Sequence, residues 1–187
     1  SIYMKTFTTI LRRKGYFVSF KHVTLAMDLS LSSPGFAVLA VTDVDGKGEP
    51  VILEKSHVKT NAKKTHGFRL CEIDNEIERY LTEYEPSHVV RERGFSRFPA
   101  TTQTLFKVVG ISDKAVYYHE GKDVHEIAPT SVKKLVTGNG KASKKDVEKA
   151  VIDRLQIEKT DYFANDDESD AAAVGLAYLI QKGLIDA

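Results

Sequence analysis

The stretch VTLAMDLSLSSPGFAVLAVTDV, residues 23–44, decides the fold, because two apolar runs flank a short polar turn. The first run, residues 23–29, predicts a buried strand that carries Asp28 near its end. The second run, residues 36–44, predicts a neighbouring strand, and the intervening Pro34-Gly35 is typical of a turn. Asp28, an acid at the end of a buried strand, is therefore the first candidate for a functional residue.

Outward from this stretch, the pattern predicts further strands and helices. Asp45-Gly46 indicates a hairpin to a third strand, and apolar residues three and four positions apart indicate helices. The expected elements are strands over residues 51–58, 87–93 and 124–128, and helices over residues 67–84, 101–109, 132–136, 143–155 and 170–181. This order predicts an α/β protein with a mixed five-stranded sheet, its first three strands antiparallel, flanked by helices.

Length and composition exclude several classes of protein. The chain has 187 residues, enough for about one domain with its own core. No apolar run approaches the ~20 residues that a membrane-spanning helix needs, so no membrane partner is expected. The single cysteine, Cys71, excludes a disulfide framework and a zinc site built from several cysteines.

The formal net charge of +1 is a sum over regions of opposite charge. Residues 1–22 contain five Lys and Arg and no Asp or Glu, so we interpret them as a basic N-terminal arm ahead of one domain, residues 23–187. A short helix is expected over residues 8–14, ended by Gly15. The arm also has the composition of an organellar transit peptide, so organellar targeting stays open as an alternative.

Four acids fall where tertiary structure can bring them together. Asp28 and Glu92 each end an expected strand, and ligands of open α/β sheets bind beyond the carboxyl ends of strands. Asp167 and Asp170 are three residues apart at the start of the last helix and therefore share a face. Carboxylates that are close together repel each other unless cations are present. Oxygen ligands select Mg²⁺ or Mn²⁺, and two such ions can catalyse hydrolysis of a phosphodiester bond.

Each acid also has a structural explanation of its own. Asp28 could open a turn, and the acids around residue 167 could stabilise the positive end of a helix dipole. Asp166 and Glu168 flank Asp167, so the third ligand could be shifted by one residue. The ordered set of acids nevertheless favours a metal-dependent site that cleaves phosphodiester bonds.

Arginines bracket the second acid. Arg93 and Arg97 follow Glu92 and are candidates for contacts with backbone phosphates. Arg91 precedes Glu92 in an expected strand, so its side chain should point to the opposite face. An actin-like nucleotide-binding fold also begins with an Asp at the end of a strand, but it needs a second glycine-rich hairpin that binds phosphate. The sequence contains no such second hairpin, so no nucleotide cofactor is expected.

Four segments resemble the RuvC family of Holliday-junction resolvases, within the ribonuclease H-like superfamily, and look closest to its bacteriophage branch. They are AMDLSLSSPGFAV (residues 26–38), PSHVVRERGF (86–95), VKKLVTGNGKASKKDV (132–147) and DESDAAAVGLAYL (167–179). The resemblance implies a ribonuclease H-like sheet and a RuvC-like nuclease domain over residues 23–187. Cellular members carry Pro-Gly directly after the first Asp, whereas five residues intervene here.

The resemblance implies roles for particular residues. Two Mg²⁺ ions per active site are implied, with Mn²⁺ as a substitute, and Phe95 takes the position of an aromatic that contacts the junction bases. Lys133 and Lys144 take the positions of lysines near the scissile phosphate, with Lys134 or Lys145 as alternatives. The metal ligands implied are Asp28, Glu92, Asp167 and Asp170, the catalytic set adds Lys144, and the DNA-binding set is Phe95, Lys133, Lys144, Lys145, Arg93 and Arg97.

The expected activity is divalent-metal-dependent cleavage of four-way DNA junctions, and of other branched DNA, by a structure-selective endonuclease. The resemblance implies a homodimer that makes two symmetric cuts, in the cytoplasm of a bacterial or phage-infected cell. Two alternatives stay open. One is a nuclease of broader specificity for branched DNA or RNA, and the other is a non-catalytic nucleic-acid-binding module with the same fold.

Overall fold

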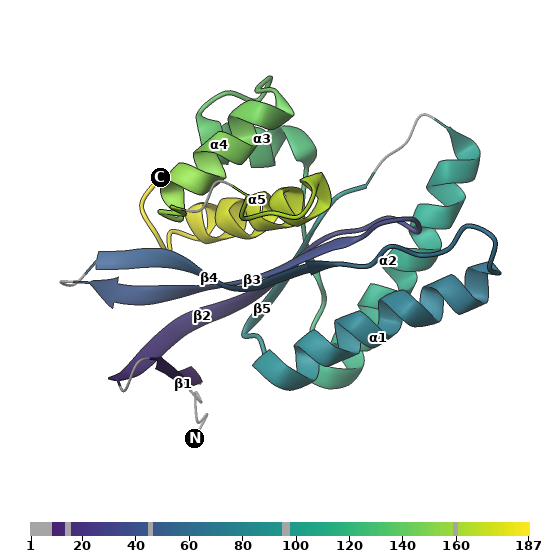
Figure 1. The fold of residues 1–187 in the computed structure, drawn as a ribbon, viewed down its shortest axis with the longest axis horizontal. Helices are drawn as coiled ribbons and strands as arrows, with labels where there is room; N and C mark the ends of the chain where they lie inside the picture. The colour runs from purple at the N-terminus through teal and green to yellow at the C-terminus, as the bar shows by residue number, and fades with distance from the viewer. Residues whose placement is uncertain (1–8, 14–15, 45–46, 95–97, 159–160) are drawn as a thin grey trace.

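A twisted mixed sheet lies between two groups of helices in the computed structural model (Figure 1). The structure describes residues 9–13, 16–44, 47–94, 98–158 and 161–187. The strands are β1 (Thr9–Arg13), β2 (Tyr16–Asp28), β3 (Gly35–Val44), β4 (Lys47–His57), β5 (His88–Glu92) and β6 (His125–Ile127). The helices are α1 (His66–Tyr84), α2 (Pro99–Glu120), α3 (Pro129–Thr137), α4 (Lys144–Arg154) and α5 (Asp166–Gln181).

The strand order is β4-β3-β2-β5-β6. Strands β2, β3 and β4 are antiparallel neighbours, whereas β5 runs parallel to β2 and β6 runs parallel to β5. The expected mixed five-stranded sheet is therefore confirmed, and β1 extends it by pairing with the first part of β2. Met27 pairs with Arg91, so the next residues, Asp28 and Glu92, end neighbouring strands at one edge of the sheet.

The two faces of the sheet are covered by different helices. Leu25 and Met27 of β2 pack in the core beneath α1 and α2, whereas Ala26 packs in the core beneath α3, α4 and α5 (Figure 1). Every residue from Ala171 to Leu179 of α5 is buried, and a helix that is apolar on all sides is held in the interior. The first turn of α5, which carries the acids, is therefore fixed against the sheet.

Close packing of α5 on the sheet depends on Gly175. A Cβ at this position would lie 2.7 Å from Leu39 Cδ1 and 3.0 Å from the Cβ of Ala26, both fully buried. We expect Gly175→Ala to lower the free energy of unfolding by about 1–3 kcal/mol, because overpacking outweighs the higher helix propensity of alanine. Urea denaturation would measure the change.

Gly67 in the first turn of α1 provides the control, since a Cβ there meets nothing within 4 Å. Gly67→Ala should leave the free energy of unfolding unchanged or raise it by up to about 1 kcal/mol. Equal effects of the two substitutions would contradict the explanation by packing.

The prediction of a helix over residues 8–14 was wrong, because Thr9–Arg13 form strand β1. This strand pairs with residues 16–20 in antiparallel register, and β2 thus begins seven residues before the expected start at residue 23. A helix of seven residues is marginal by itself in water, whereas a β-branched and aromatic sequence favours a strand when a partner is present. Gly15 lies outside the described residues.

Three helices are clearly longer than expected, and one of them, α3, spans Pro129–Thr137 where residues 132–136 were expected. Helix α2 continues past residue 109 to Glu120, because Ser112, Ala115 and Val116 remain buried and keep the helix packed beyond Gly110. It ends at Gly121, which takes the left-handed conformation at φ 63°. Helix α5 begins at Asp166, four residues early, because the Asn165 side chain caps it. Of the helices that the structure describes, none combines the length and apolarity needed to cross a bilayer.

Candidate active site

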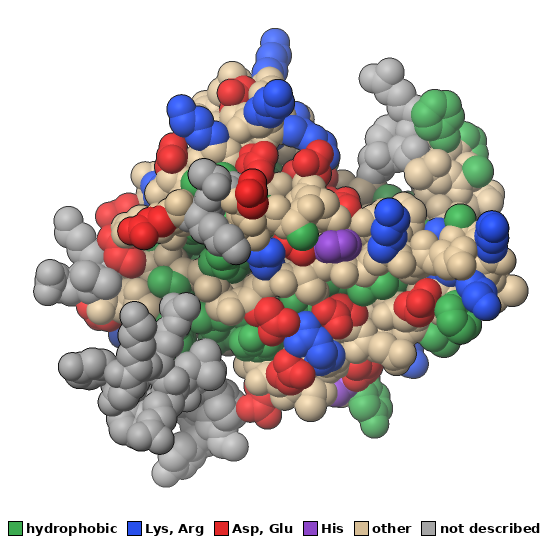
Figure 2. Space-filling view, viewed as in Figure 1, with side chains coloured by type: hydrophobic (Ala, Val, Ile, Leu, Met, Phe, Trp, Pro, Cys, Tyr) green, Lys and Arg blue, Asp and Glu red, His purple; other side chains and the backbone are tan. Residues whose placement is uncertain are grey.

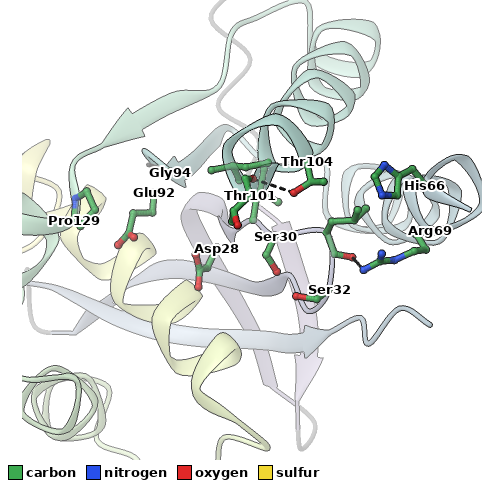
Figure 3. A pocket seen from close by; sticks show the side chains of 13 residues that line it. Asp28, Ser30, Ser32, His66, Arg69, Glu92, Gly94, Thr101, Thr104 and Pro129 are labelled. Carbon is green, nitrogen blue, oxygen red and sulfur yellow. Dashed lines mark hydrogen bonds between the residues drawn. The ribbon is translucent and has the colours of Figure 1, made fainter. Parts of the chain in front are cut away.

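Asp28 and Glu92 face a shared space beyond the ends of β2 and β5 (Figure 3). Both side chains are partly buried, and both line two cavities of about 470 and 310 Å³. The larger cavity extends from these carboxylates towards the start of α1, where His66 and Arg69 line it (Figure 3). The two strand-end acids therefore line the same cavities.

The acids of α5 divide between two environments. Asp170 lines the smaller cavity together with Asp28 and Glu92. Asp167 lines neither of these cavities, and its Oδ2 accepts a hydrogen bond of 2.5 Å from Ser33 Oγ in the loop after β2. Asp167 still lies near enough to Asp28 to raise the pKa of that carboxyl. Three of the four expected acids thus line one cavity, and the fourth, Asp167, does not.

The carboxyl groups of Asp28 and Glu92 hold their protons more tightly than usual. Burial raises the pKa of Asp28 from 3.8 to about 7, and the charges of Asp170 and Asp167 add to the rise while Lys144 opposes it. Burial likewise raises the pKa of Glu92 from 4.5 to about 7, with further contributions from Asp28 and Asp170. Perturbed titration of neighbouring groups in a cavity is typical of functional sites.

One lysine of the lysine-rich segment pairs with an acid of the site. Lys144 begins α4 directly after the Ser143 N-cap, and its Nζ lies 2.8 Å from Asp170 Oδ2. Lys133 of α3 lines the same cavity. Of the alternatives considered for these positions, Lys145 is exposed without lining this cavity, and Lys134 lines a separate cavity of about 610 Å³.

The arginines around Glu92 have different surroundings. Arg91 is buried and forms ion pairs with Asp113 and Glu126, away from the carboxylate site, as expected from strand alternation. Arg93 is exposed, and its Nε is 4.0 Å from Glu126 Oε2. Phe95 and Arg97 lie outside the described residues.

Glu168 has a structural role that sequence patterns do not reveal. Its side chain is only 5% exposed and accepts hydrogen bonds from Lys55 Nζ at 2.5 Å, from His57 Nδ1 at 2.8 Å and from the Ala164 amide at 2.9 Å. These contacts tie the start of α5 to β4. Glu168 is therefore engaged at the sheet, which argues against the alternative in which it replaces Asp167 as a ligand.

The order and directions of the strands are those of a ribonuclease H-like fold. A family model described as "Crossover junction endodeoxyribonuclease RuvC" matches residues 24–178. The chain belongs to the RuvC family.

Individual relatives agree with this assignment. The chain is 28% identical over 159 residues to the RuvC of Prochlorococcus marinus, covering 85% of this chain and 97% of that protein. It is 29% identical over 160 residues to the RuvC of Rickettsia conorii, covering 86% and 98%. The solved structure of Thermus thermophilus RuvC in complex with Holliday junction substrate has a TM-score of 0.77 at 23% identity, covering 87% and 96%, which supports the fold.

Membership of this family implies dependence on a divalent metal ion. The types of side chain present suit such an ion, because carboxylates line the cavity and burial raises the pKa of two of them, Asp28 and Glu92. Within the described residues, no three His, Cys, Asp or Glu side chains stand close enough together to hold an ion. Coordination by Asp28, Glu92 and Asp170 therefore requires these side chains to move closer together.

Proposed function

We propose that this chain is a divalent-metal-dependent, structure-selective endonuclease that resolves four-way DNA junctions and cuts other branched DNA. The observation that carries this proposal is the convergence of Asp28, Glu92 and Asp170 on one cavity, with Lys144 beside them, in a chain of the RuvC family. Such a substrate places the activity in the compartment that holds the DNA, the cytoplasm of a bacterial or phage-infected cell.

In this proposal Asp28, Glu92 and Asp170 hold two Mg²⁺ ions, for which Mn²⁺ can substitute, and Asp167 either completes the set or orients it through Ser33. The bound ions would supply an activated water and stabilise the leaving oxygen. Lys144 and Lys133 would contact the scissile phosphate, since both line the same cavity. Lys145, Arg93, Arg97 and Phe95 remain proposed contacts to the rest of the junction.

We propose that the chain consists of a basic arm over residues 1–22 and a nuclease domain over residues 23–187. The family match beginning at residue 24 supports this boundary. Strand β2 nevertheless crosses it without interruption, so the arm continues directly into the sheet.

A homodimer is the assembly that this proposal requires, because two symmetric cuts need two active sites. Among the described residues, four of the five exposed large apolar side chains lie on α2 or at its N-cap, namely Phe98, Phe106, Tyr117 and Tyr118. An exposed apolar patch of this kind is typical of a protein–protein interface. We therefore propose α2 as the dimer surface.

A cleavage panel tests the proposed function. The purified chain would be incubated in Mg²⁺ with a synthetic four-way junction, a fork, a linear duplex and an RNA–DNA hybrid of matched length. We expect the four-way junction to be cut preferentially. Comparable cutting of the fork or of the hybrid would favour the broader nuclease, and binding without any product in Mg²⁺ or Mn²⁺ would favour the non-catalytic module.

Removal of the Lys144 charge should impair cleavage more than binding. Lys144→Gln is expected to lower the single-turnover cleavage rate by about 10–100-fold, because a cation beside the reacting phosphate stabilises charge that develops in the transition state. Lys149→Gln, an exposed lysine of the same helix, should change the rate by less than about threefold. Equal rates for the two variants would contradict the proposed role of Lys144.

A further inference from the structure

The loop between β4 and α1, residues 58–65, has a concentration of positive charge that the proposed active site does not use. It carries Lys59, Lys63 and Lys64, all exposed, and no acidic residue. Lys107 of α2 lies beside it, since its Nζ is 3.1 Å from Nδ1 of His66. We call these four lysines the lysine patch. Figure 2 shows basic side chains gathered at the end of the molecule where α1 begins.

The charges of the lysine patch are not neutralised by carboxylates of the described residues. Within the described ranges, none of the four lysines forms an ion pair with a carboxylate. Lys64 instead lies 5.4 Å from the ring centre of the exposed Phe68. Uncompensated like charges on one surface repel each other and attract a polyanion.

The loop is held rigidly to the segment that follows Asp28. The buried Thr60 donates from Oγ1 to the Leu31 carbonyl at 2.7 Å and from its amide to the Ser32 carbonyl at 3.0 Å. The buried Arg69 donates to Thr60 Oγ1 at 2.9 Å and to the Leu31 carbonyl at 3.3 Å. The lysine patch is therefore fixed in position relative to the carboxylates.

A cavity runs from the carboxylates to His66, which lies beside Lys107 of the lysine patch. The cavity of about 470 Å³ has Asp28 and Glu92 at one end and His66 and Arg69 at the other (Figure 3). Hydroxyl groups line the space between these ends, from Ser30, Ser32, Thr101 and Thr104. A nucleic-acid strand that occupies this cavity would emerge next to the lysines.

We infer that the lysine patch is a phosphate-contact surface that binds a duplex arm of the junction where the arm leaves the cut site. This inference rests on the proposed function and names a contact surface outside the carboxylate site. Lysines that contact backbone phosphates contribute affinity without sequence preference and make binding depend on salt, because each contact releases counterions.

The experiment compares two double variants of equal charge. Lys63→Gln with Lys64→Gln removes half of the lysine patch, and Lys122→Gln with Lys182→Gln removes two lysines near the opposite end of β5 and at the end of α5. Fluorescence anisotropy in EDTA would measure affinity for a labelled four-way junction over a range of salt. We expect the first variant to bind about tenfold more weakly, with a salt slope lower by about 2.

The control variant should match the wild type within about twofold in affinity. Equal weakening in both double variants would show a general effect of net charge and overturn the inference, as would wild-type affinity and salt slope in the Lys63/Lys64 variant. A wild type that binds junctions without cutting them would overturn the proposed endonuclease activity, and the binding comparison would still decide the role of the lysines. A wild type that does not bind junctions would overturn both.

Discussion

Asp28→Asn is expected to lower the rate of junction cleavage by at least about 10³-fold while the protein becomes more stable. The loss of activity follows from removal of a carboxylate that faces Glu92 and Asp170 across one cavity, since metal ions that activate water and leaving groups supply several kcal/mol of transition-state stabilisation. Single-turnover assays in Mg²⁺ would measure the rate, and Asp123→Asn, at an exposed position, is the control.

The gain in stability follows from the raised pKa of Asp28, which is about 7 in the folded chain against an ordinary value of 3.8. At a pH between these two pKa values, the folded chain binds a proton that the unfolded chain has lost. The free energy of unfolding therefore falls as the pH rises through this range. In metal-free buffer at pH 8, Asp28→Asn should therefore raise the free energy of unfolding by about 2 kcal/mol. The advantage should shrink towards pH 4, where the carboxyl is protonated.

The response to metal separates a ligand from a residue that matters only for packing. Mg²⁺ should raise the melting temperature of the wild type, because binding to the folded state alone stabilises it. The same addition should have a smaller effect on Asp28→Asn. A variant that cleaved junctions at the wild-type rate, or that gained no stability at pH 8, would contradict the assignment of Asp28 to a buried metal site.

Gly35→Ala is expected to disrupt the candidate active site, although Gly35 has no side chain that could take part in the chemistry. Gly35 begins β3 opposite Asp28, and a Cβ there would lie 1.9 Å from the carbonyl oxygen of Asp167 and 2.3 Å from its carbonyl carbon. Backbone atoms cannot rotate away as a side chain does, so the start of α5 would have to move. We expect the free energy of unfolding to fall by about 3 kcal/mol.

Cleavage should fall by about 10²-fold in Gly35→Ala even under conditions where the variant is folded, because displacement of about 1 Å at an active site has an effect of this size. The affinity for Mg²⁺, measured by calorimetry, should fall as well, since Asp170 moves with α5. Gly67→Ala, where the added Cβ has open space, should retain wild-type cleavage. Wild-type stability and activity in Gly35→Ala would contradict the close approach of β3 and α5.

Much of the fold could be predicted because its signals are local. The ends of the strands at Asp28 and Glu92 follow from short apolar runs and their turn residues, although β2 begins seven residues before its expected start. Ser143 caps α4 through a capping box with Asp146, which is a pattern that spans four residues. Among the exceptions, the strand at residues 9–13 and the length of α2 are places where a tertiary partner overrides local preference.

The sequence by itself determined the order of the elements from residue 23 onwards, the family resemblance, and the set of acids that stand at strand ends and at the start of the last helix. Only the tertiary structure decided that Asp170 faces Asp28 and Glu92 while Asp167 accepts a hydrogen bond from Ser33, 134 residues away. It also decided that Glu168 is held by Lys55 and His57 and that Gly35 touches the backbone of α5. The physical reason is that periodicity and capping act within a few residues, whereas contacts across the sheet depend on how distant segments pack.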